Sequence, residues 1–309
     1  MLTVGELVAR AAAQGTAVPG FNIPYLPMMA PVVRALRDCR CMGLIMVARL
    51  EWVKFQSGGI GPIRETYERV KDERFTRLHL DHVPVIDEDD LRVDYEAILR
   101  DAVALGYDSV MVDGSRLPLE ENAEATKCVV DMAHARGVAV EGELGAVMGH
   151  EAGPLPPYEE LFASGKGFTD PEEARSFVER TGVDWLSVAV GSVHGAISTA
   201  RKSEKKIEAR LNIEHLERIR RRVGIPLVLH GGTGIRKADI MASIRHGIAK
   251  INIATAIRQP YERAIKESPA DAEQAVYKAM LTVIRDDLEL EGSADRLNPQ
   301  ESNTRKESR

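Results

Sequence analysis

The chain has 309 residues, 44% of them hydrophobic, and a formal net charge of −6 at pH 7. This is enough apolar material for one large core, and the mildly acidic balance excludes a basic field that would attract nucleic acid or an anionic membrane. No apolar run approaches the length of a membrane span. The three cysteines (Cys39, Cys41 and Cys128) show no CxxC spacing, which is typical of reduced thiols. We therefore expect a cytoplasmic protein that binds neither nucleic acid nor a membrane.

Short apolar runs that end in polar or glycine residues follow one another along the chain. They are 17–22, 43–49, 76–82, 108–115, 138–145, 185–195, 225–234 and 249–255. Stretches of helical period lie between them, and those at 91–106 and 119–137 end in glycine, the usual C-cap residue. Such alternation indicates a parallel sheet buried on both faces. Because no GxGxxG follows the first run and polar residues end nearly all runs, we predict a (β/α)8 (TIM) barrel rather than an open doubly wound sheet.

Two segments fall outside this alternation. Residues 146–169 form a long connection that contains glycine and proline, and connections of this length are usually lids, binding loops or disordered. From Gly292 onward the chain is charged and almost free of large apolar groups, which indicates a disordered tail or one draped on a partner subunit. We therefore predict one barrel domain, residues 1–291, with a mobile loop after the fifth strand, and a charged tail, 292–309.

Three histidines, His82, His194 and His230, fall at the ends of the third, sixth and seventh runs. One imidazole at a barrel mouth could be a general base, a structural hydrogen-bonding group or a metal ligand. Three that converge, with one coordination position left open, are typical of a catalytic zinc site. We predict that these three bind the metal. The other histidines are interpreted as helix-surface, strand or loop residues.

Carboxylates accompany the predicted metal ligands. Glu141 and Glu143 in the fifth run could coordinate the metal or orient its ligands. Asp81 directly precedes His82, and on a regular strand the two side chains would point to opposite sides. If the chain turns at the strand end, both reach the mouth, where Asp81 could transfer protons. The alternative is that Asp81 only caps the following loop.

Glycine and small polar residues end the last three runs. They are Gly195, Gly231, Gly232, Thr233, Gly234, Asn252, Ile253, Ala254 and Thr255. Loops after the seventh and eighth strands of a barrel commonly bind phosphate through backbone N–H groups and a helix N-terminus. Glycine lets the main chain approach the anion closely. We predict that a phosphorylated substrate is held there.

Six motifs resemble the strand-end motifs of the class II fructose- and tagatose-bisphosphate aldolases in sequence, order and spacing: LHLDH, VMVDGS, VEGELG, VGSVHG, LHGGTG and KINIAT. The resemblance implies a zinc-dependent homodimer or homotetramer. Its expected reaction is the reversible cleavage of a phosphorylated ketose, such as fructose or tagatose 1,6-bisphosphate, into dihydroxyacetone phosphate and an aldehyde.

The same resemblance implies roles for single residues. Asp81 would handle the proton on the aldehyde-derived oxygen, and Glu151 would exchange the proton on the carbon next to the carbonyl. Asn22 would lie on the substrate side, and Glu143 and Asp113 would form a second metal position or orient the ligands. The residues that surround the phosphate of dihydroxyacetone phosphate would be Gly195, Gly231, Gly232, Thr233, Asn252, Ile253, Ala254 and Thr255. Those matching a Na⁺ or K⁺ site of some members are Val193, Gly195, Gly231 and Thr233.

The catalytic chemistry does not require a lysine. Zinc acts as a Lewis acid for the negative charge left by C–C cleavage, and Lys250, the nearest candidate for a Schiff base, is expected at the wrong end of its strand. A metal-dependent hydrolase on the same barrel is the alternative enzyme class. It is disfavoured because the first strand ends in Phe21-Asn22 rather than in the HxH pair usual for hydrolases.

Two departures from the family concern the aldehyde half of the substrate. The family's Asp-Pro-Arg segment, whose arginine reaches the distal phosphate, is replaced here by 267–269 (Glu-Ser-Pro), and the second run ends in Arg49 instead of a small Ser or Thr. Arg49 could pair with a non-standard distal group, such as a carboxylate, a sulfonate or a repositioned phosphate. The alternative is that Arg49 faces solvent and that Arg258, Arg263 or Arg285 substitutes for the missing arginine.

Overall fold

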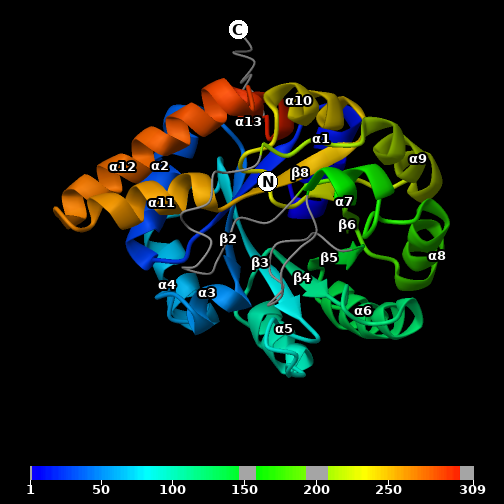
Figure 1. The fold of residues 1–309 in the computed structure, drawn as a ribbon. Helices are drawn as coiled ribbons and strands as arrows, with labels where there is room; N and C mark the ends of the chain where they lie inside the picture. The colour runs from blue at the N-terminus through cyan, green and yellow to red at the C-terminus, as the bar shows by residue number, and fades with distance from the viewer. Residues whose placement is uncertain (1, 146–157, 193–207, 300–309) are drawn as a thin grey trace, which may run out of the picture.

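The computed structural model of the chain describes residues 2–145, 158–192 and 208–299. Its strands pair in parallel in the order β1-β2-β3-β4-β5-β6-β7-β8 and close into a barrel, with helices around the outside (Figure 1). The predicted (β/α)8 fold is therefore confirmed. The strands are β1 Val18–Asn22, β2 Gly43–Ala48, β3 Thr76–Pro84, β4 Ser109–Asp113, β5 Ala139–Leu144, β6 Trp185–Val188, β7 Leu227–Leu229 and β8 Ile248–Ile253.

The described α-helices precede the first strand, connect the strands or follow the last one. They are α1 Val4–Ala13, α2 Met29–Asp38, α3 Arg49–Val53, α4 Ile60–Val70, α5 Tyr95–Ala104, α6 Leu119–His134, α7 Tyr158–Ser164, α8 Pro171–Thr181, α9 Ile213–Val223, α10 Lys237–Arg245, α11 Thr255–Ala264, α12 Pro269–Thr282 and α13 Ser293–Leu297. A 3-10 helix, Leu26–Met28, precedes α2, and a π-helical turn, Val283–Asp287, follows α12. No helix in the described ranges is long and apolar enough to cross a membrane.

Local sequence signals explain several helix boundaries. Helix α1 begins with a capping box between Thr3 and Glu6, and α8 begins with Asp170 as N-cap. The predicted glycine ends of α5 and α6 are Gly106 and Gly137, at φ 81° and 69°. A residue with a Cβ rarely adopts this left-handed conformation, so glycine ends these helices at low cost.

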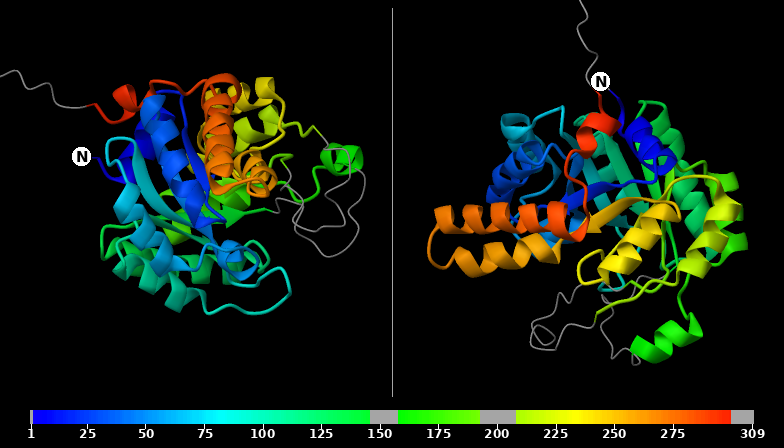
Figure 2. Two further views of the ribbon diagram at one scale, coloured as in Figure 1. Left: turned by 90° about the vertical axis from the view of Figure 1, so that its left-hand side faces the viewer. Right: turned by 90° about the horizontal axis from the view of Figure 1, so that it is seen from above.

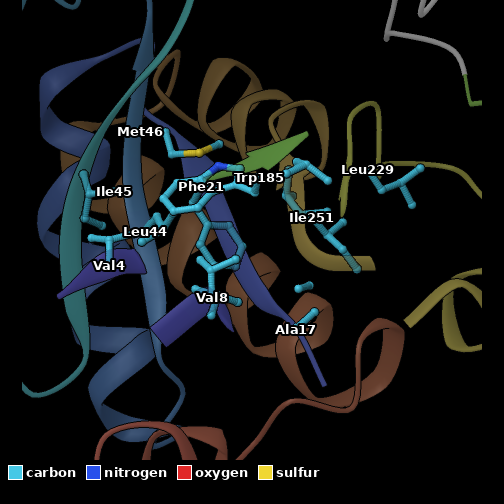
Figure 3. Close-up of a cluster of buried hydrophobic side chains, with 14 of the residues drawn as sticks. Val4, Val8, Ala17, Phe21, Leu44, Ile45, Met46, Trp185, Leu229 and Ile251 are labelled. Carbon is cyan, nitrogen blue, oxygen red and sulfur yellow. The ribbon is translucent and has the colours of Figure 1, made fainter. Parts of the chain in front are cut away.

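The hydrophobic core joins the barrel strands to the surrounding helices. Figure 3 shows Phe21 of β1 and Trp185 of β6 close together, with side chains of α1, such as Val8, on the same cluster. Trp185 is 1% exposed and Phe21 is fully buried. Because the strands are buried on both faces, their sequences read as nearly continuous apolar runs.

Helices α11 and α12 form a pair that extends away from the barrel, as Figure 2 shows in the view from above. Helix α12 also packs against α2. The Glu-Ser-Pro segment, 267–269, is the turn of this pair: Ser268 is the N-cap of α12, and its side chain accepts a hydrogen bond from the N–H of Asp271. The segment that replaces the family's Asp-Pro-Arg therefore serves here to start a helix.

Part of the segment from residue 292, expected to be disordered or draped on a partner subunit, forms the helix α13 in this structure. Helix α13 lies against the first part of the barrel, near the N-terminus (Figure 2), and Leu297 is fully buried. The guanidinium of Arg10 donates to the Leu297 carbonyl (3.2 Å), and Asp295 pairs with Arg74 (3.1 Å). Only two buried apolar residues, Ala294 and Leu297, anchor this helix, and so few give little signal in a charged sequence. Residues 300–309 lie outside the described ranges.

Candidate active site

One pocket lies at the carboxyl ends of the strands, where the sequence places its polar residues. Its lining comes from the ends of β1, β2, β3, β7 and β8 and from the helices α3 and α11. The lining residues are Asn22, Ala48, Leu50, Glu51, Phe55, Asp81, His82, His230, Gly231, Thr233, Asn252, Ala254, Thr255 and Arg258. Nine of the residues predicted from the strand ends are thus brought to one pocket: Asn22, Asp81, His82, His230, Gly231, Thr233, Asn252, Ala254 and Thr255.

Asp81 and His82 both reach the pocket, but not because the strand ends there. Strand β3 continues to Pro84, and its register with β4 shifts between Leu80 and Val83. His82 has φ 28°, an uncommon value for a residue with a side chain. This β-bulge breaks the alternation of the strand, so two consecutive side chains face the same space. The expected turn at the strand end is therefore a bulge within the strand.

His82 and His230 lie next to each other at the predicted metal position. Their ring centroids are 4.5 Å apart, and Asp81, His82 and His230 offer ligand atoms within 4.8 Å of one another. A second overlapping group is formed by His82, Asp113 and Glu143. His82 Nδ1 is 3.3 Å from Asp113 Oδ2 and 3.7 Å from Glu143 Oε2. The structure thus brings together two predicted ligands and both candidate residues for a second metal position.

The charges around His82 favour a cation at this position. Burial alone would lower the pKa of His82, but the carboxylates of Asp81 and Asp113 raise it to about 10. Burial and the neighbouring His82 lower the pKa of His230, which suits a neutral imidazole ligand. Burial and the charge of Asp113 raise the pKa of Glu143 well above its ordinary value.

The donor set fits a zinc ion. Imidazole nitrogens and carboxylate oxygens are ordinary zinc ligands. Glu143 Oε2 is buried and has no hydrogen-bond partner among the described residues, although it lies 3.5 Å from His230 Nδ1. A bound cation near His82 and His230 would compensate such a carboxylate, whose burial is otherwise costly. The third predicted ligand, His194, lies outside the described residues.

Asp81 is held by two amide side chains. Asn22 Nδ2 donates to Asp81 Oδ2 at 3.0 Å, and Asn252 Nδ2 donates to Asp81 Oδ1 at 2.9 Å. Burial would raise the pKa of Asp81, but the charges of His82 and Lys250 bring it below its ordinary value. The carboxylate is therefore a fixed hydrogen-bond acceptor beside the metal position. This geometry does not fit the alternative that Asp81 only caps a loop.

Glu141, predicted as a possible ligand or as a residue that orients the ligands, belongs to a buried ionic layer under the pocket, and the rest of this layer was not recognised from the sequence. Lys250 Nζ lies 2.8 Å from Glu141 Oε2, and Glu141 Oε1 lies 2.8 Å from His230 Nε2. His79 Nδ1 hydrogen bonds to Ser109 Oγ (2.8 Å), and burial together with the charge of Lys250 lowers the His79 pKa to about 3. The side chains of this layer are fully buried. Glu141 therefore orients His230 from below.

The period of the strands could have revealed this layer. His79 and Asp81, Glu141 and Glu143, and Lys250 and Asn252 are each two residues apart on one strand. Residues at i and i+2 of a strand point to the same side. If the upper member of each pair faces the barrel interior, the lower member must also face it.

In the predicted phosphate loops, the main chain lies close to the neighbouring strand, with no room for a side chain at Gly232. Gly231 has φ 67°, and a Cβ on Gly232 would lie 2.9 Å from the carbonyl oxygen of Asn252 and 2.7 Å from Ile251 Cγ2. Thr233 Oγ1 is buried and finds no hydrogen-bond partner within the described part of the chain, although the residue lines the pocket. Helix α11 begins at Thr255, also in the pocket lining. Gly232 and Ile253 support this loop pair but are not lining residues.

Arg49 is not brought to the pocket with the others. It is the first residue of α3, and its Nη1 pairs with Asp87 Oδ2 at 3.3 Å, away from the lining residues. One of the predicted substitutes, Arg258 of α11, does line the pocket and is 6% exposed. Arg285 instead pairs with Glu291 on the surface. The prediction that Arg49 binds the distal group therefore has no support in this geometry. Helix α3 begins at Arg49, and the side chain pairs with Asp87 instead of lining the pocket.

A buried acid in the pocket was also missed. Glu51 of α3 is 7% exposed, and its Oε2 accepts from the N–H of Ala48 at 2.8 Å. Asn22 Nδ2 lies 3.5 Å from the same oxygen, so Asn22 lies between Asp81 and Glu51. Burial raises the pKa of Glu51 to about 8, and the charge of Asp81 adds to this effect. The only signal in the sequence was an acidic residue directly after the apolar second run, in the segment RLEW (49–52).

The remaining predicted residues lie outside the described ranges. They are His194, Val193 and Gly195 after β6, and Glu151 after β5. Their roles, and with them the Na⁺ or K⁺ site and the proton exchange assigned to Glu151, stay predictions.

Comparison with known proteins agrees with this site. The family model "Fructose-bisphosphate aldolase class-II" matches residues 2–296. A probable fructose-bisphosphate aldolase of Bacillus subtilis (strain 168) is 34% identical over 274 residues, which cover 87% of each chain. A fructose-bisphosphate aldolase of Staphylococcus epidermidis is 33% identical over 270 residues, 86% of this chain and 85% of the relative.

Solved structures agree as well. The YdjI aldolase from Escherichia coli K12 matches with a TM-score of 0.73 and 29% identity, covering 95% of this chain and all of that one (100%). A putative fructose-1,6-bisphosphate aldolase from Coccidioides immitis matches with a TM-score of 0.74 and 27% identity, covering 95% of this chain and 98% of that one. The chain belongs to the class II fructose-bisphosphate aldolase family and is an aldehyde-lyase on a TIM barrel.

Proposed function

We propose that this enzyme is a zinc-dependent aldolase that reversibly cleaves a phosphorylated ketose into dihydroxyacetone phosphate and an aldehyde. One observation carries the proposal: Asp81, His82 and His230 converge in the same pocket as the glycine loop 231–233. The first group of residues suits C–C cleavage beside a carbonyl, and the loop suits a phosphate. Fructose and tagatose 1,6-bisphosphate are the candidate substrates.

The metal would be held by His82 and His230, with His194 as the third ligand. When bound, zinc would supply a Lewis acid that stabilises the negative charge developing on substrate oxygens. Glu141 fixes the ring of His230 through the 2.8 Å contact with Nε2. Asp113 lies 3.3 Å from His82 and would orient this ligand or take part in a second metal position.

Asp81 would act on the proton of the substrate hydroxyl. In the cleavage direction, the C4 hydroxyl gives its proton to Asp81 while the C3–C4 bond breaks and the C4 carbonyl forms. The electron pair of the broken bond stays on the dihydroxyacetone phosphate fragment, and we assign its protonation at C3 to Glu151. Because Asn22 and Asn252 donate to both oxygens of Asp81, the carboxylate is held ready to accept a proton.

The substrate phosphate would bind against the loop 231–233 and the start of α11. Thr233 Oγ1 lacks a protein partner among the described residues and can donate to a phosphate oxygen. The first N–H groups of α11 have no partners within the helix and carry its positive dipole end. This anchor would place the ketone of the bound molecule toward the metal ligands.

A metal-removal experiment tests the function. The wild-type enzyme should cleave fructose or tagatose 1,6-bisphosphate, lose this activity in a chelator and regain it with Zn²⁺. His230→Ala should bind zinc at least about tenfold more weakly and lose more than about a hundredfold in kcat, because a ligand is missing. Metal content by elemental analysis, and circular dichroism to verify folding, accompany the assay. Cleavage that is fully retained by metal-free enzyme would overturn the proposal.

A further inference from the structure

The part of the pocket beyond Asp81 contains two buried ionisable side chains that the proposed reaction leaves without a task. Glu51 and Arg258 both line the pocket, at 7% and 6% exposure. They come from helices after different strands, α3 after β2 and α11 after β8. Because burying ionisable groups is costly without a partner or a role, their presence in a substrate pocket needs an explanation.

The two oxygens of Glu51 have different surroundings. Oε2 accepts the hydrogen bond of the Ala48 N–H and lies near Asn22 Nδ2, so it is used by the protein. Oε1 has no hydrogen-bond partner among the described residues, although the side chain belongs to the pocket lining. The capping of α3 and the nearby Asn22 therefore account for the contacts of Oε2. Oε1 is available to a molecule in the pocket.

The guanidinium nitrogens of Arg258 also differ in whether the protein already uses them. Its Nη1 donates to Glu262 Oε1 at 2.7 Å, and Tyr25 donates to the same oxygen at 3.0 Å, so the guanidinium is held in place. Its Cζ lies 5.2 Å from the ring centroid of Phe55, which belongs to the same wall of the pocket. Within the described ranges, Nε and Nη2 have no hydrogen-bond acceptor, and they can donate to a bound molecule.

The contacts show which half of the substrate meets these residues. Asn22 bridges Asp81 and Glu51. In the proposed reaction Asp81 takes the proton from the C4 oxygen, so Glu51 lies on the aldehyde side of the bond that breaks. The phosphate loop 231–233 lies after β7, beside the metal ligand His230, and serves the other half.

We propose that Glu51 and Arg258 select the aldehyde half of the substrate, with Glu51 Oε1 contacting a hydroxyl group next to the aldehyde carbon. Arg258 donates to an oxygen farther along the same molecule. This inference rests on the proposed function. It assigns the enzyme a hydroxyaldehyde partner, such as an aldose, rather than a deoxy aldehyde.

The chemistry of a hydroxyl group suits both residues. A hydroxyl can donate to a carboxylate or accept from a protonated carboxyl, so its contact with Glu51 holds in either protonation state. A site that hydrogen bonds a substrate hydroxyl rejects the analogue without it, because the buried polar group is then left unpaired. Because the carboxylate of Glu262 already offsets the charge of Arg258, the site carries no excess of positive charge. Arg258 would therefore suit an uncharged hydroxyl or a group with a single negative charge.

The test uses the aldol direction with dihydroxyacetone phosphate and two aldehydes. Glyceraldehyde and 3-hydroxypropanal differ only in the hydroxyl next to the aldehyde carbon. Wild-type enzyme should prefer glyceraldehyde by about tenfold to a hundredfold in kcat/KM, the value of one buried hydrogen bond to a polar group. Glu51→Met should reduce this ratio to near one, and Glu51→Gln, which keeps a polar group, should restore part of it.

Matched controls separate selection from structure. Asp108 accepts a hydrogen bond from the Leu78 N–H at 2.7 Å, but it precedes β4 at the opposite end of the barrel. Asp108→Leu should lower stability and leave the aldehyde ratio unchanged. Arg64 pairs with Glu68 at i,i+4, as Arg258 pairs with Glu262. Arg258→Met should raise the KM for glyceraldehyde relative to glycolaldehyde, which lacks the third carbon, whereas Arg64→Met should not.

A partial reaction separates a failure of the proposed aldolase function from a failure of the role proposed for Glu51. Dihydroxyacetone phosphate alone should exchange its C3 proton with deuterium in heavy water, a step that needs no aldehyde. Unchanged exchange in Glu51→Met together with a lost hydroxyl preference supports the inference. A wild-type enzyme that shows no exchange and no cleavage contradicts the proposed function itself. If the wild type exchanges the proton normally but uses both aldehydes equally well, only the role of Glu51 is overturned. If Glu51→Met does not fold, the ratio of the two aldehydes in the wild type alone tests this role.

Discussion

At the residue scale, the pocket and the ionic layer under it contain three carboxyl groups whose surroundings give them different protonation behaviour. Asp81 receives an amide hydrogen bond on each oxygen and remains an acceptor. Glu141 is buried but faces the charge of Lys250 and the ring of His230, which lower its pKa. Glu51 has no such counter-charge in contact among the described residues, and burial raises its pKa to about 8. Groups with such separated pKa values can take different roles within one site.

The raised pKa of Glu51 predicts a pH-dependent stability difference. Since the folded-state pKa exceeds the unfolded value of 4.5, the folded chain binds more protons, and the wild type loses stability as pH rises from 4.5 to about 8. Glu51→Gln removes this cost. The variant should therefore gain on the wild type as pH rises, reaching a few kcal/mol at pH 8, since one pKa unit is worth about 1.4 kcal/mol.

Urea unfolding of metal-free protein at pH 5, 6, 7 and 8 measures this difference. A gap between Glu51→Gln and wild type that stays constant across the series would show that Glu51 titrates normally in the folded chain.

At the element scale, the loops after β7 and β8 are fitted to each other so closely that a side chain at residue 232 would force neighbouring atoms to move. A Cβ there would meet the carbonyl oxygen of Asn252 at 2.9 Å and Ile251 Cγ2 at 2.7 Å. Asn252 is also the residue that donates to Asp81. The loop 231–233, proposed to bind phosphate, and Asp81, the proposed proton acceptor, are therefore linked through one short segment of β8.

Gly232→Ala should disturb both functions of this segment. The backbone of β8 must shift to remove the clash, which should cost about 1–3 kcal/mol of stability and raise the KM for dihydroxyacetone phosphate about tenfold or more. Steady-state kinetics and urea unfolding measure the two effects. Gly61, on α4, has open space where a Cβ would be added, so Gly61→Ala is the control and should leave the KM unchanged.

Much of this arrangement follows from the sequence at the same scale. Apolar runs separated by helical stretches predict the barrel, and polar residues at strand ends predict Asp81, His82 and His230. Glu51 could not be placed, and Arg258 could only be named as one of three alternatives, because both residues lie on helices, α3 and α11. Which side of a helix faces the pocket depends on the residue at which that helix starts. For the same reason the sequence favours Arg49, two positions before Glu51, for a place in the pocket that the structure gives to Arg258.

At the scale of the whole molecule, the last described helix lies beside the first. Helix α13 packs beside α1, and Arg10 of α1 donates to the Leu297 carbonyl. Asn298 Nδ2 donates to the carbonyl of Arg74, just before β3 (3.0 Å). The last described helix thus connects the start of the barrel to the segment that leads into the strand of Asp81 and His82.

Leu297→Ala should destabilise the enzyme by about 2–4 kcal/mol, because it opens a cavity at a fully buried position. Leu105→Ala is the control, since Leu105 is 41% exposed, and it should change stability by less than about 1 kcal/mol. Urea unfolding measures both variants. Equal effects would mean that α13 does not stabilise the barrel.

The bulge in β3 has a consequence for the apo and metal-bound forms. His82 adopts its left-handed backbone conformation only while the folded strands on both sides enforce it. A ligand that binds the folded chain alone stabilises it by mass action, in proportion to the logarithm of its concentration over the dissociation constant. If His82 is a zinc ligand, as proposed above, any change elsewhere in the barrel that relaxes this dihedral angle should weaken zinc binding. The zinc affinity would then measure how firmly the fold holds His82.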